Sequence, residues 1–508
     1  MSFFMNDLKR KPLVTPSSCL GRLTGFCFIR SKPILAIATV ATLVSGCTGG
    51  GGGGTGTALS GSTKVVLLAS SIANDQLAAF ETTLESLTLT SQSGKQVTVL
   101  ASPVGDEFIH LNGHVEPLVT VSVPQDVYVS AAVTDNGGGS SYCAGHDSGV
   151  PFHDELPSGE NSIVNLPNPV TVTGAAMGLV LNLQVASLPG GCPSPAQYAF
   201  APPVTAAFNL TPMAFAAQPT NSSNGMAPGL QGLISSVDAG GTGFTVSALV
   251  NGAEVLDPPT WHAVVNGNTV FQAVAGASQL SAGLPVDMDL AIQSDGSLLA
   301  TRVAVISTDT TTLTVANGTP LNVVTSAPIA DISGPAQEGY LPLGEGGFGP
   351  VNFGSANFQI SGQLGNLAAL PFTASFDAAN IVPGQNLTLT TQAAAFAGGP
   401  NYTPVTTMTL RPQTINGTVS AVSTSGSFTT YTVTLASYDI FPQFATQPGQ
   451  TTLLPNPNTV IVYADSNTQM LNSDAIAAGG VFRFYGLIFN DNGTLRMDCA
   501  QVSNGVAE

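Results

Sequence analysis

Three segments in the second half of the chain repeat one pattern of apolar residues and glycine. Each has an apolar residue, a glycine three positions later, and then two apolar residues separated by one position. The segments are LSAGLPVDM (280–288), IVPGQNLTL (381–389) and IAAGGVFRF (476–484). A turn with glycine at its tight point, followed by a strand with one buried face, produces this pattern, because side chains on a strand alternate between its faces. The spacing therefore predicts strands and excludes helices at all three places.

The same alternation makes a prediction about two acidic residues. In the first copy, Asp287 and Asp289 alternate with Val286, Met288 and Leu290. Because the apolar side chains face a core, the two carboxylates lie on the opposite face of the strand. We therefore expect Asp287 and Asp289 to face solvent.

Two of the copies extend on both sides. GLISSV (232–237), followed by Phe244, parallels GTVSAV (417–422), followed by Phe428. DGSL (295–298) parallels NGTL (492–495), and both are hairpin signals that lead into a final strand. We predict small antiparallel β-barrels, OB-like or similar, because closing a barrel removes exposed strand edges. Their predicted ranges are 229–307, 413–508 and, for a diverged middle copy, 308–412.

Residues 64–218 carry short Val- and Thr-rich runs separated by turn residues, which is typical of a β-sandwich. One expected strand is EFIHLN (107–112). The stretch VPQDVY (123–128) resembles the turn that leads into a strand in immunoglobulin-like and prealbumin-like domains, although Asp126 stands near the place of a glycine. Residues 219–228 (PTNSSNGMAP) are predicted as a linker. The expected fold class is all-β: an N-terminal β-sandwich followed by two or three small antiparallel β-barrel (OB-like) repeats.

The charge of the chain is one-sided. The formal net charge is −18, from 12 basic and 30 acidic residues, and residues 1–46 contain six of the basic residues and one of the acids. The remainder therefore has six basic and 29 acidic residues, a net charge of about −23. Phosphate backbones repel such a body, so we expect no nucleic-acid partner.

The N-terminal segment has the features of an export signal. Arg30 and Lys32 precede an apolar run, ILAIATVATLV (34–44), that is shorter than the roughly 20 residues a membrane-spanning helix needs. The sequence VSGC (44–47) then resembles the lipobox of bacterial lipoproteins. That resemblance implies that residues 1–46 are removed and that Cys47 carries a diacylglycerol. The alternatives are an ordinary signal peptide with an incidental Cys47, and a start at Met5.

A glycine-rich stretch follows this cysteine. Residues 47–63 (CTGGGGGGTGTALSGST) have the composition of a flexible linker, which suits a tether between a lipid anchor and a folded body. Thr48 is not an aspartate, and in the lipoprotein family this implies sorting to the outer membrane. The whole chain resembles a group of uncharacterised bacterial envelope lipoproteins. They combine an N-terminal β-sandwich domain and C-terminal repeats of a small β-barrel domain, both of unknown function, so the resemblance implies no activity.

Three cysteines follow Cys47 in a compartment that permits disulfides. Cys143 and Cys192 lie in two loops of the predicted sandwich, and we expect them to form a disulfide. Cys499 lies on a predicted strand, where we expect a buried free thiol.

Motifs for chemistry are weak. One loop gathers five potential metal ligands, but their spacing favours an exposed polar loop over a zinc site: His146, Asp147, His153, Asp154 and Glu155. The glycines of GEGGFG (344–349) match a dinucleotide fingerprint by letter, but we expect a loop before them and no helix after them. Trp261 is expected in the core and not as a sugar-binding platform. We predict no catalytic residue, no metal and no cofactor.

Three functions remain open at this point. The first is a non-catalytic, lipid-anchored envelope protein whose modules bind or space a glycan, a matrix polymer or another protein. The second is a periplasm-facing structural or assembly factor that offers strand edges to client proteins. The third and weakest is a hydrolase with two carboxylates, which should show a cleft with a perturbed acid pair. A binding protein should instead show exposed polar or aromatic patches on the barrels.

Overall fold

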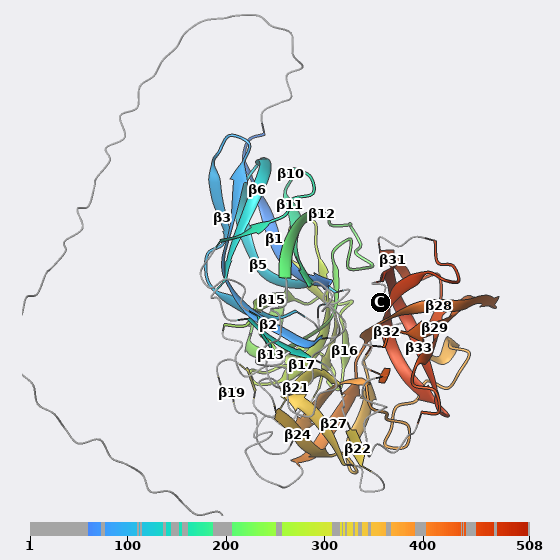
Figure 1. The fold of residues 1–508 in the computed structure, drawn as a ribbon. Helices are drawn as coiled ribbons and strands as arrows, with labels where there is room; N and C mark the ends of the chain where they lie inside the picture. Colours follow the sequence, from blue (N-terminus) through green and yellow to red (C-terminus); the bar gives the residue numbers. More distant parts are fainter. Residues whose placement is uncertain are drawn as a thin grey trace, which may run out of the picture. The chain divides into compact units, whose positions relative to one another are not determined.

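In a computed structural model the described part of the chain is all-β, as the sequence predicts (Figure 1). No helix within it has the length and hydrophobicity that crossing a membrane requires. The description covers residues 59–505 apart from 73–76, 109–110, 112–113, 136–138, 144–151, 155–160, 186–205, 250–256, 307–314, 317–318, 321–322, 329–330, 334–337, 344–346, 362–366, 392–402, 438, 440, 443–453 and 472–474.

The N-terminal part consists of two sheets that share one core. The first sheet has the order β12-β11-β1-β5, with β1 and β11 parallel. Its strands are β1 (Ser62–Ile72), β5 (Glu116–Pro124), β11 (Ala176–Val185) and β12 (Ala206–Met213). The second sheet has the order β10-β6-β2-β7-β8, with β3 and β4 paired to β2 and β9 paired to β6. Its strands are β2 (Leu77–Ser91), β3 (Gln96–Leu100), β4 (Val104–Glu107), β6 (Asp126–Asp135), β7 (Gly139–Cys143), β8 (Phe152–Asp154), β9 (Asn161–Val164) and β10 (Val170–Val172).

Alternating apolar residues of both sheets build this core. Leu67 of β1 and Leu181 of β11 pack in the same cluster as Leu87 of β2 and Val133 of β6. The buried Tyr128 of β6 donates a hydrogen bond from its hydroxyl to the carbonyl of Pro124 at the end of β5, at 2.9 Å. The side chain thereby holds the turn that the sequence pattern indicated.

Two expectations for this half need correction. Of EFIHLN, residues 109, 110 and 112 lie outside the described residues; β4 ends at Glu107, and Phe108 and Leu111 lie in the core outside any strand. The next strand, β13, begins at Met226, inside the segment predicted as a linker. The residues before it form a hydrogen-bonded turn in which Asn224 Oδ1 accepts the backbone N–H of Asn221 at 3.0 Å.

The next sheet closes into a barrel, here called the first barrel (residues 226–306). Its strand order is β15-β14-β13-β17-β18-β16, and parallel pairing of β15 with β18 closes five of the strands. The strands are β13 (Met226–Val237), β14 (Gly243–Ala248), β15 (Thr260–Val264), β16 (Val270–Gln272), β17 (Pro285–Ile292) and β18 (Leu298–Val305).

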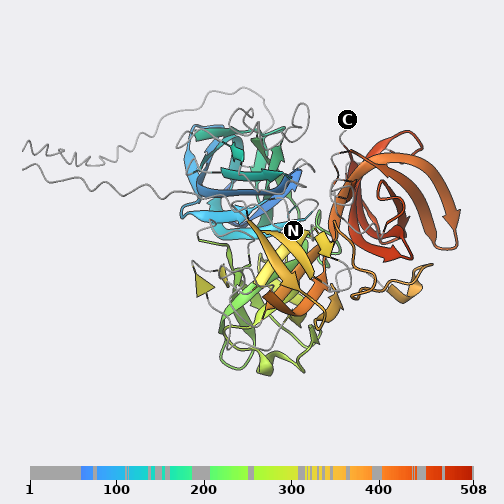
Figure 2. The same ribbon diagram turned by 60° about the horizontal axis from the view of Figure 1, so that its bottom comes forward.

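The last barrel (residues 413–505) has the same connectivity. Its order is β30-β29-β28-β32-β33-β31, again closed by a parallel pair, β30 with β33. Figure 2 shows these strands, orange to red, curving around a common centre. They are β28 (Gln413–Ser425), β29 (Phe428–Leu435), β30 (Thr459–Ala464), β31 (Gln469–Leu471), β32 (Val481–Asp491) and β33 (Thr494–Asn504).

The middle module (residues 315–411) keeps part of this arrangement. Both β24 and β25 run parallel to β27, as β15 and β16 do to β18. Its strands are β19 (Val315–Ala316), β20 (Thr319–Pro320), β21 (Val323–Pro328), β22 (Asp331–Ser333), β23 (Glu338–Leu343), β24 (Gly347–Asn352), β25 (Asn357–Ile360), β26 (Asn386–Thr391) and β27 (Thr403–Leu410). Residues 347–349 of the GEGGFG motif lie in β24, which pairs antiparallel with β23, and residues 344–346 lie outside the described residues. The segment before the motif is therefore a strand where we expected a loop, and the residues after it continue β24, in line with the expectation that no helix follows.

The turn predicted at the repeated glycine is present in all three copies. Gly283, Gly384 and Gly479 have φ values of 90°, 98° and 90°, which residues other than glycine rarely adopt. In each copy a strand begins two residues later: β17, β26 and β32.

One predicted equivalence between the outer copies is wrong. Val237 pairs with Phe244 in the first barrel, but Val422 pairs with Tyr431 in the last barrel. Tyr431 and not Phe428 is therefore the counterpart of Phe244, because the hairpin of the last barrel is longer.

Candidate functional site

Two acidic residues of β17 occupy the centre of the candidate site. Asp287 and Asp289 are 4% and 8% exposed, so the prediction that they face solvent is wrong. The alternation itself is correct, because Val286, Met288 and Leu290 lie in the core of the first barrel. The opposite face of β17 is buried because other parts of the chain cover it.

Arg302 neutralises both carboxylates from the neighbouring strand. It lies on β18 directly across from Asp289 in the antiparallel register. Its Nε donates to Asp289 Oδ2 at 2.8 Å and its Nη2 to Asp289 Oδ1 at 2.9 Å, and Nη2 also pairs with Asp287 Oδ1. This fork-to-fork geometry is the strong, orientation-specific form of an ion pair.

A second arginine comes from the middle module. Arg411, which follows β27, pairs through Nη1 with Asp287 Oδ2 and donates from Nη2 to the carbonyl of Gly229 at 2.6 Å. Gln231 of β13 donates to Asp287 Oδ2 at 3.3 Å and accepts a hydrogen bond from Thr388 of β26 at 2.8 Å. The cluster therefore joins the first barrel to the middle module.

The charges of this cluster balance, with two aspartates against two arginines. Burial acts to raise the pKa of Asp287, but Arg411 and Arg302 outweigh it and hold that pKa below its usual value. Burial likewise opposes the charge of Arg302, and the two aspartates outweigh it and raise its pKa. With the backbone N–H of Gly229 on Asp289 Oδ1, every carboxylate oxygen accepts a hydrogen bond or ion pair. The cluster is thus suited to holding modules together and not to proton transfer.

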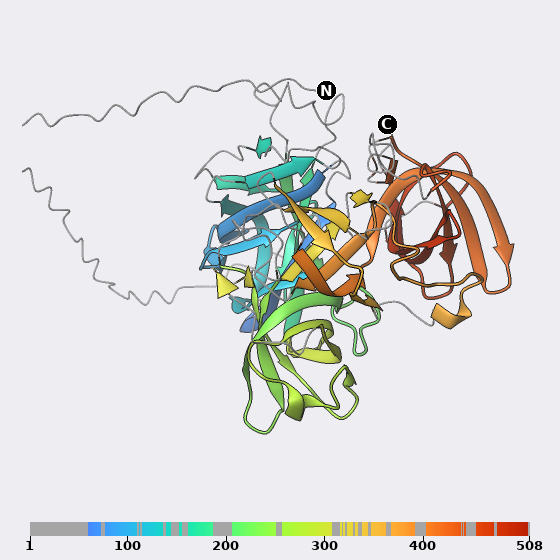
Figure 3. The ribbon, with the colours of Figure 1, turned by 90° about the horizontal axis from the view of Figure 1, so that it is seen from below.

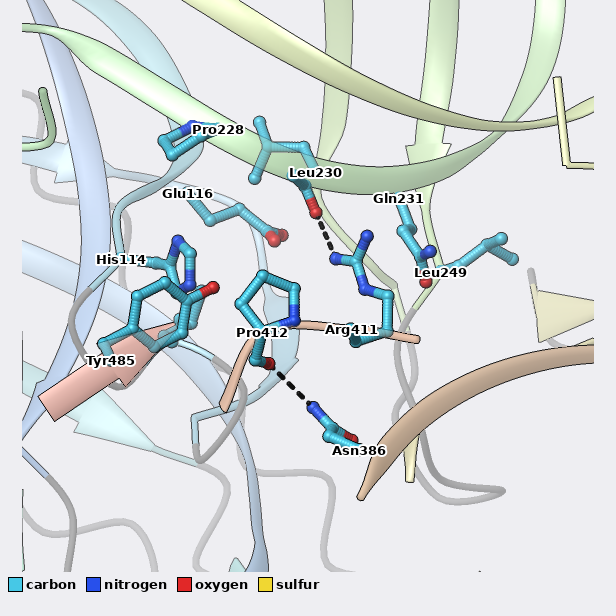
Figure 4. Close-up of a pocket in the computed structure, with 12 residues that line it drawn as sticks. His114, Glu116, Pro228, Leu230, Gln231, Leu249, Asn386, Arg411, Pro412 and Tyr485 are labelled. Carbon is cyan, nitrogen blue, oxygen red and sulfur yellow. Dashed lines mark hydrogen bonds between the residues drawn. The ribbon is translucent and has the colours of Figure 1, made fainter. Parts of the chain in front are cut away.

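A small cavity adjoins Arg411 (Figure 4). Its volume is about 30 Å³, which is room for water and far below the roughly 300 Å³ of an ordinary ligand pocket. Arg411 Nε has no hydrogen-bond acceptor among the described residues, and a water in this cavity would supply one. The lining residues are Leu111, His114, Glu116, Pro228, Gly229, Leu230, Gln231, Leu249, Asn386, Arg411, Pro412 and Tyr485.

The cavity lies where all four parts of the folded chain contribute residues. His114 precedes β5 of the N-terminal sheets, and its ring contacts the ring of Tyr485 on β32 edge-on, with centroids 4.0 Å apart. Asn386 of the middle module donates from Nδ2 to the carbonyl of Pro412 at 3.2 Å. The site is therefore a junction.

The residues predicted from the sequence have different outcomes. Cys47 and Cys192 lie outside the described residues. Of Cys143 only the backbone is described, and it is the last residue of strand β7 and not part of a loop as predicted. The disulfide therefore stays a prediction. Cys499 on β33 is a buried free thiol, as predicted, and burial, with a contribution from Asp498, raises its pKa.

The predictions about metal ligands and about Trp261 also have different outcomes. His153 and Asp154 lie on β8 and not in the expected loop, and the side chains of all five predicted ligands are outside the description. The described residues contain no group of three potential metal ligands. Trp261 is a core residue, as predicted, at 2% exposure. Its indole N–H donates to the carbonyl of Pro117 on β5, which ties the first barrel to the N-terminal sheets.

One carboxyl group has the raised pKa that a hydrolase would need. Burial and the nearby Asp465 raise the pKa of Asp498 to about 6. Asp465, however, accepts hydrogen bonds from the backbone N–H and the side chain of Asn467 at 2.8 and 3.1 Å. It acts as the cap of a turn, and the pair lacks the two free carboxyl groups of a glycosidase site.

That turn is a repeated feature that the sequence reasoning missed. Asn266 and Asp465 each accept the backbone N–H two residues later, at 2.8 Å in both barrels. Thr269 and Thr468 each donate to a carbonyl on the final strand, at 2.7 and 2.8 Å. The shared letters Asn-Thr at 268–269 and 467–468 were the available signal.

The two arginines were also missed as site residues. Only six basic residues follow position 46, so each arginine stands out in an almost uncharged context. An isolated arginine near alternating acids is a signal for a buried ion pair.

Comparison with known proteins does not assign the chain to a family, since no family model and no curated protein matches it.

Proposed function

We propose that this is a non-catalytic, lipid-anchored protein of the bacterial cell envelope, sorted to the outer membrane, whose β-modules act together as one body for binding or spacing. The lipobox at Cys47 and the glycine-rich tether support the anchor. The proposal that the modules act together as one non-catalytic body depends on the buried cluster around Asp287. The charged groups of this cluster join two modules to each other. Its ligand would be a glycan, a matrix polymer or a protein.

Further contacts support a single body over a flexible string of modules. Val66 and Leu68 of β1 share a core with Phe244 and Leu290 of the first barrel. Leu487 and Phe489 of β32 share a core with Leu389 and Met408 of the middle module. Buried apolar joints of this kind resist relative motion, whereas modules made for independent binding are separated by polar linkers.

The distribution of basic residues limits the ligand. Of the six basic residues after position 46, only Lys64 and Lys95 are exposed. Arg302, Arg411 and Arg483 are buried, so they do not offset the acids at the surface. A surface of this kind favours neutral or basic ligands, such as a neutral glycan or a basic protein face, over polyanions.

The anchoring half is tested by fractionating cells that express the wild type or Cys47→Ser. We expect the wild type in the membrane fraction and the variant in soluble fractions or retained as uncleaved precursor. Cys27→Ser, in the predicted signal segment, is the matched control and should behave as the wild type. A Cys47→Ser protein that is processed and stays with the outer membrane would overturn the proposal.

Protease treatment of intact cells then addresses orientation. Digestion on intact cells supports a surface protein that binds an external glycan or protein. Protection until the outer membrane is opened favours the second candidate, a periplasm-facing assembly factor. One observation supports that candidate: among the described residues, positions 420–425 of β28 have a strand partner on one side only, and such an edge could receive a client strand.

A further inference from the structure

One edge of the last barrel continues beyond its partner. β28 pairs with β32 only from Gln413 to Thr418, and Val419 then exchanges backbone hydrogen bonds with the turn at Gly479 and Gly480. On its other side β28 stays paired with β29 as far as Ser425. From Ser420 to Ser425 the strand therefore has no neighbour on one side among the described residues. Figure 3 shows this hairpin as the long orange pair of strands.

The free edge is exposed and uncharged. Residues 420–425 are all exposed, and Val422 is one of the most exposed large apolar residues of the described chain, at 43%. No charged residue occurs between positions 413 and 438. Edge strands in soluble proteins are normally protected by a charge, a proline or a covering segment. Residues 420–425 (SAVSTS) contain neither a charge nor a proline.

The first barrel provides an internal comparison. Its equivalent strand, β13, ends at Val237, the counterpart of Val422. The next residue is Asp238, whose carboxylate pairs with His262 at 3.0 Å. The position of Asp238 corresponds to Ser423 in the last barrel. The same hairpin thus carries a charge in one copy, where the strand stops, and none in the other, where the strand continues.

We propose that the edge of β28 at residues 420–425 pairs with the same edge of a second copy of this chain. Antiparallel pairing of a strand with itself obeys a two-fold axis, which is the commonest symmetry of protein dimers. A register centred on Val422 brings the two Val422 side chains together and removes them from water. The proposal is independent of the anchor and of the ligand.

The absence of charge on this edge allows a second copy to approach here, where most other surfaces would repel it. The chain after residue 46 has a net charge of about −23, so most of its surfaces repel another copy. An uncharged edge is the place where two such bodies can approach closely. If the protein is anchored in a membrane, confinement there raises the effective concentration for this contact.

The test measures the oligomeric state of the purified, processed protein in detergent by analytical ultracentrifugation over a range of concentrations. We expect a monomer–dimer equilibrium. Ser423→Asp places on the edge the residue that the first barrel carries, and it should weaken the dimer about tenfold or more. Ser235→Asp, on the equivalent hairpin of the first barrel, is the control and should leave the equilibrium unchanged.

A mixing experiment separates self-pairing of this edge from dimerisation through another surface. Ser423→Asp and Ser423→Lys should each dimerise weakly alone, and their mixture should recover a dimer that contains one of each. Unchanged thermal melting of both variants shows that they fold. A wild type that stays monomeric at all concentrations, or a dimer that Ser423→Asp leaves intact, would overturn the proposal.

Discussion

Replacing Asp498 with asparagine should stabilise the protein at neutral pH. Asp498 lies on β33 of the last barrel, where burial first and Asp465 second raise its pKa from 3.8 to about 6. At neutral pH the folded protein therefore holds an ionised carboxylate in a place that disfavours the charge. Asparagine has nearly the same shape and carries no charge, so it removes this cost.

The size of the effect follows from the difference between the two pKa values. A carboxyl group with a higher pKa when folded binds its proton more tightly in the folded state. Its protonation therefore adds stability as the pH falls through about 6, and the gain is complete below 3.8. A shift of this size corresponds to about 3 kcal/mol between the two limits. Asp498→Asn should thus raise the free energy of unfolding at pH 7.5 by about 2–3 kcal/mol and have little effect at pH 4.

Urea denaturation of the wild type and the variant at several pH values measures this difference. Comparing the two proteins at each pH cancels the many other carboxyl groups that titrate in the same range. Asp491→Asn is the control, because Asp491 pairs with Arg496 at 2.7 Å and its loss should not stabilise the protein. The reasoning is refuted if Asp498→Asn gives no gain at pH 7.5, or if its gain is the same at pH 4 and pH 7.5.

Three further predictions concern the joints and the repeats. Arg411→Met removes one of the two positive charges that neutralise the buried Asp287. Urea denaturation should therefore show that the free energy of unfolding falls by about 3–5 kcal/mol. A decrease of less than about 1 kcal/mol would mean that the cluster does not hold the modules together. Gly417→Ala should lower the melting temperature because its Cβ would collide with the carbonyl of Thr434, whereas Gly267→Ala, with open space around it, should not. Trypsin should cut the folded body first after Lys95, in the exposed turn between β2 and β3, and mass spectrometry of the fragments would contradict the burial of the arginines if Arg302 or Arg483 were cut as fast.

Local features of the fold could be predicted from the sequence. The repeated glycines mark real turns, and the alternation after them places Val286 and Met288 in a barrel core, because both depend on residues close together in the chain. Phe428 was paired with the wrong counterpart because one hairpin is longer than the other, and the pattern alone does not reveal such a difference. EFIHLN has strand-like composition, yet its described apolar residues, Phe108 and Leu111, reach the core from outside any strand.

The site could not be predicted in this way, because it depends on residues far apart in the sequence. Alternation correctly shows that Asp287 faces away from its own barrel, but it does not reveal what lies on that side. The partner is Arg411, 124 positions later and in another module. Contacts at such a distance follow from how modules pack, and a single sequence carries no periodic signal for them.

The repeat also indicates how related modules can contact each other without self-association. The position four residues after the repeated glycine is Asp287 in the first barrel, Thr388 in the middle module and Arg483 in the last barrel, and all three are buried. In the first two copies this position lies in the joint: Asp287 pairs with Arg411, and Thr388 donates to Gln231. Two copies of Asp287 facing each other would repel, and two copies of Arg483 would do the same. Because equivalent positions carry different side chains, the joint between the first barrel and the middle module pairs unlike surfaces and disfavours contact between two copies of the same surface.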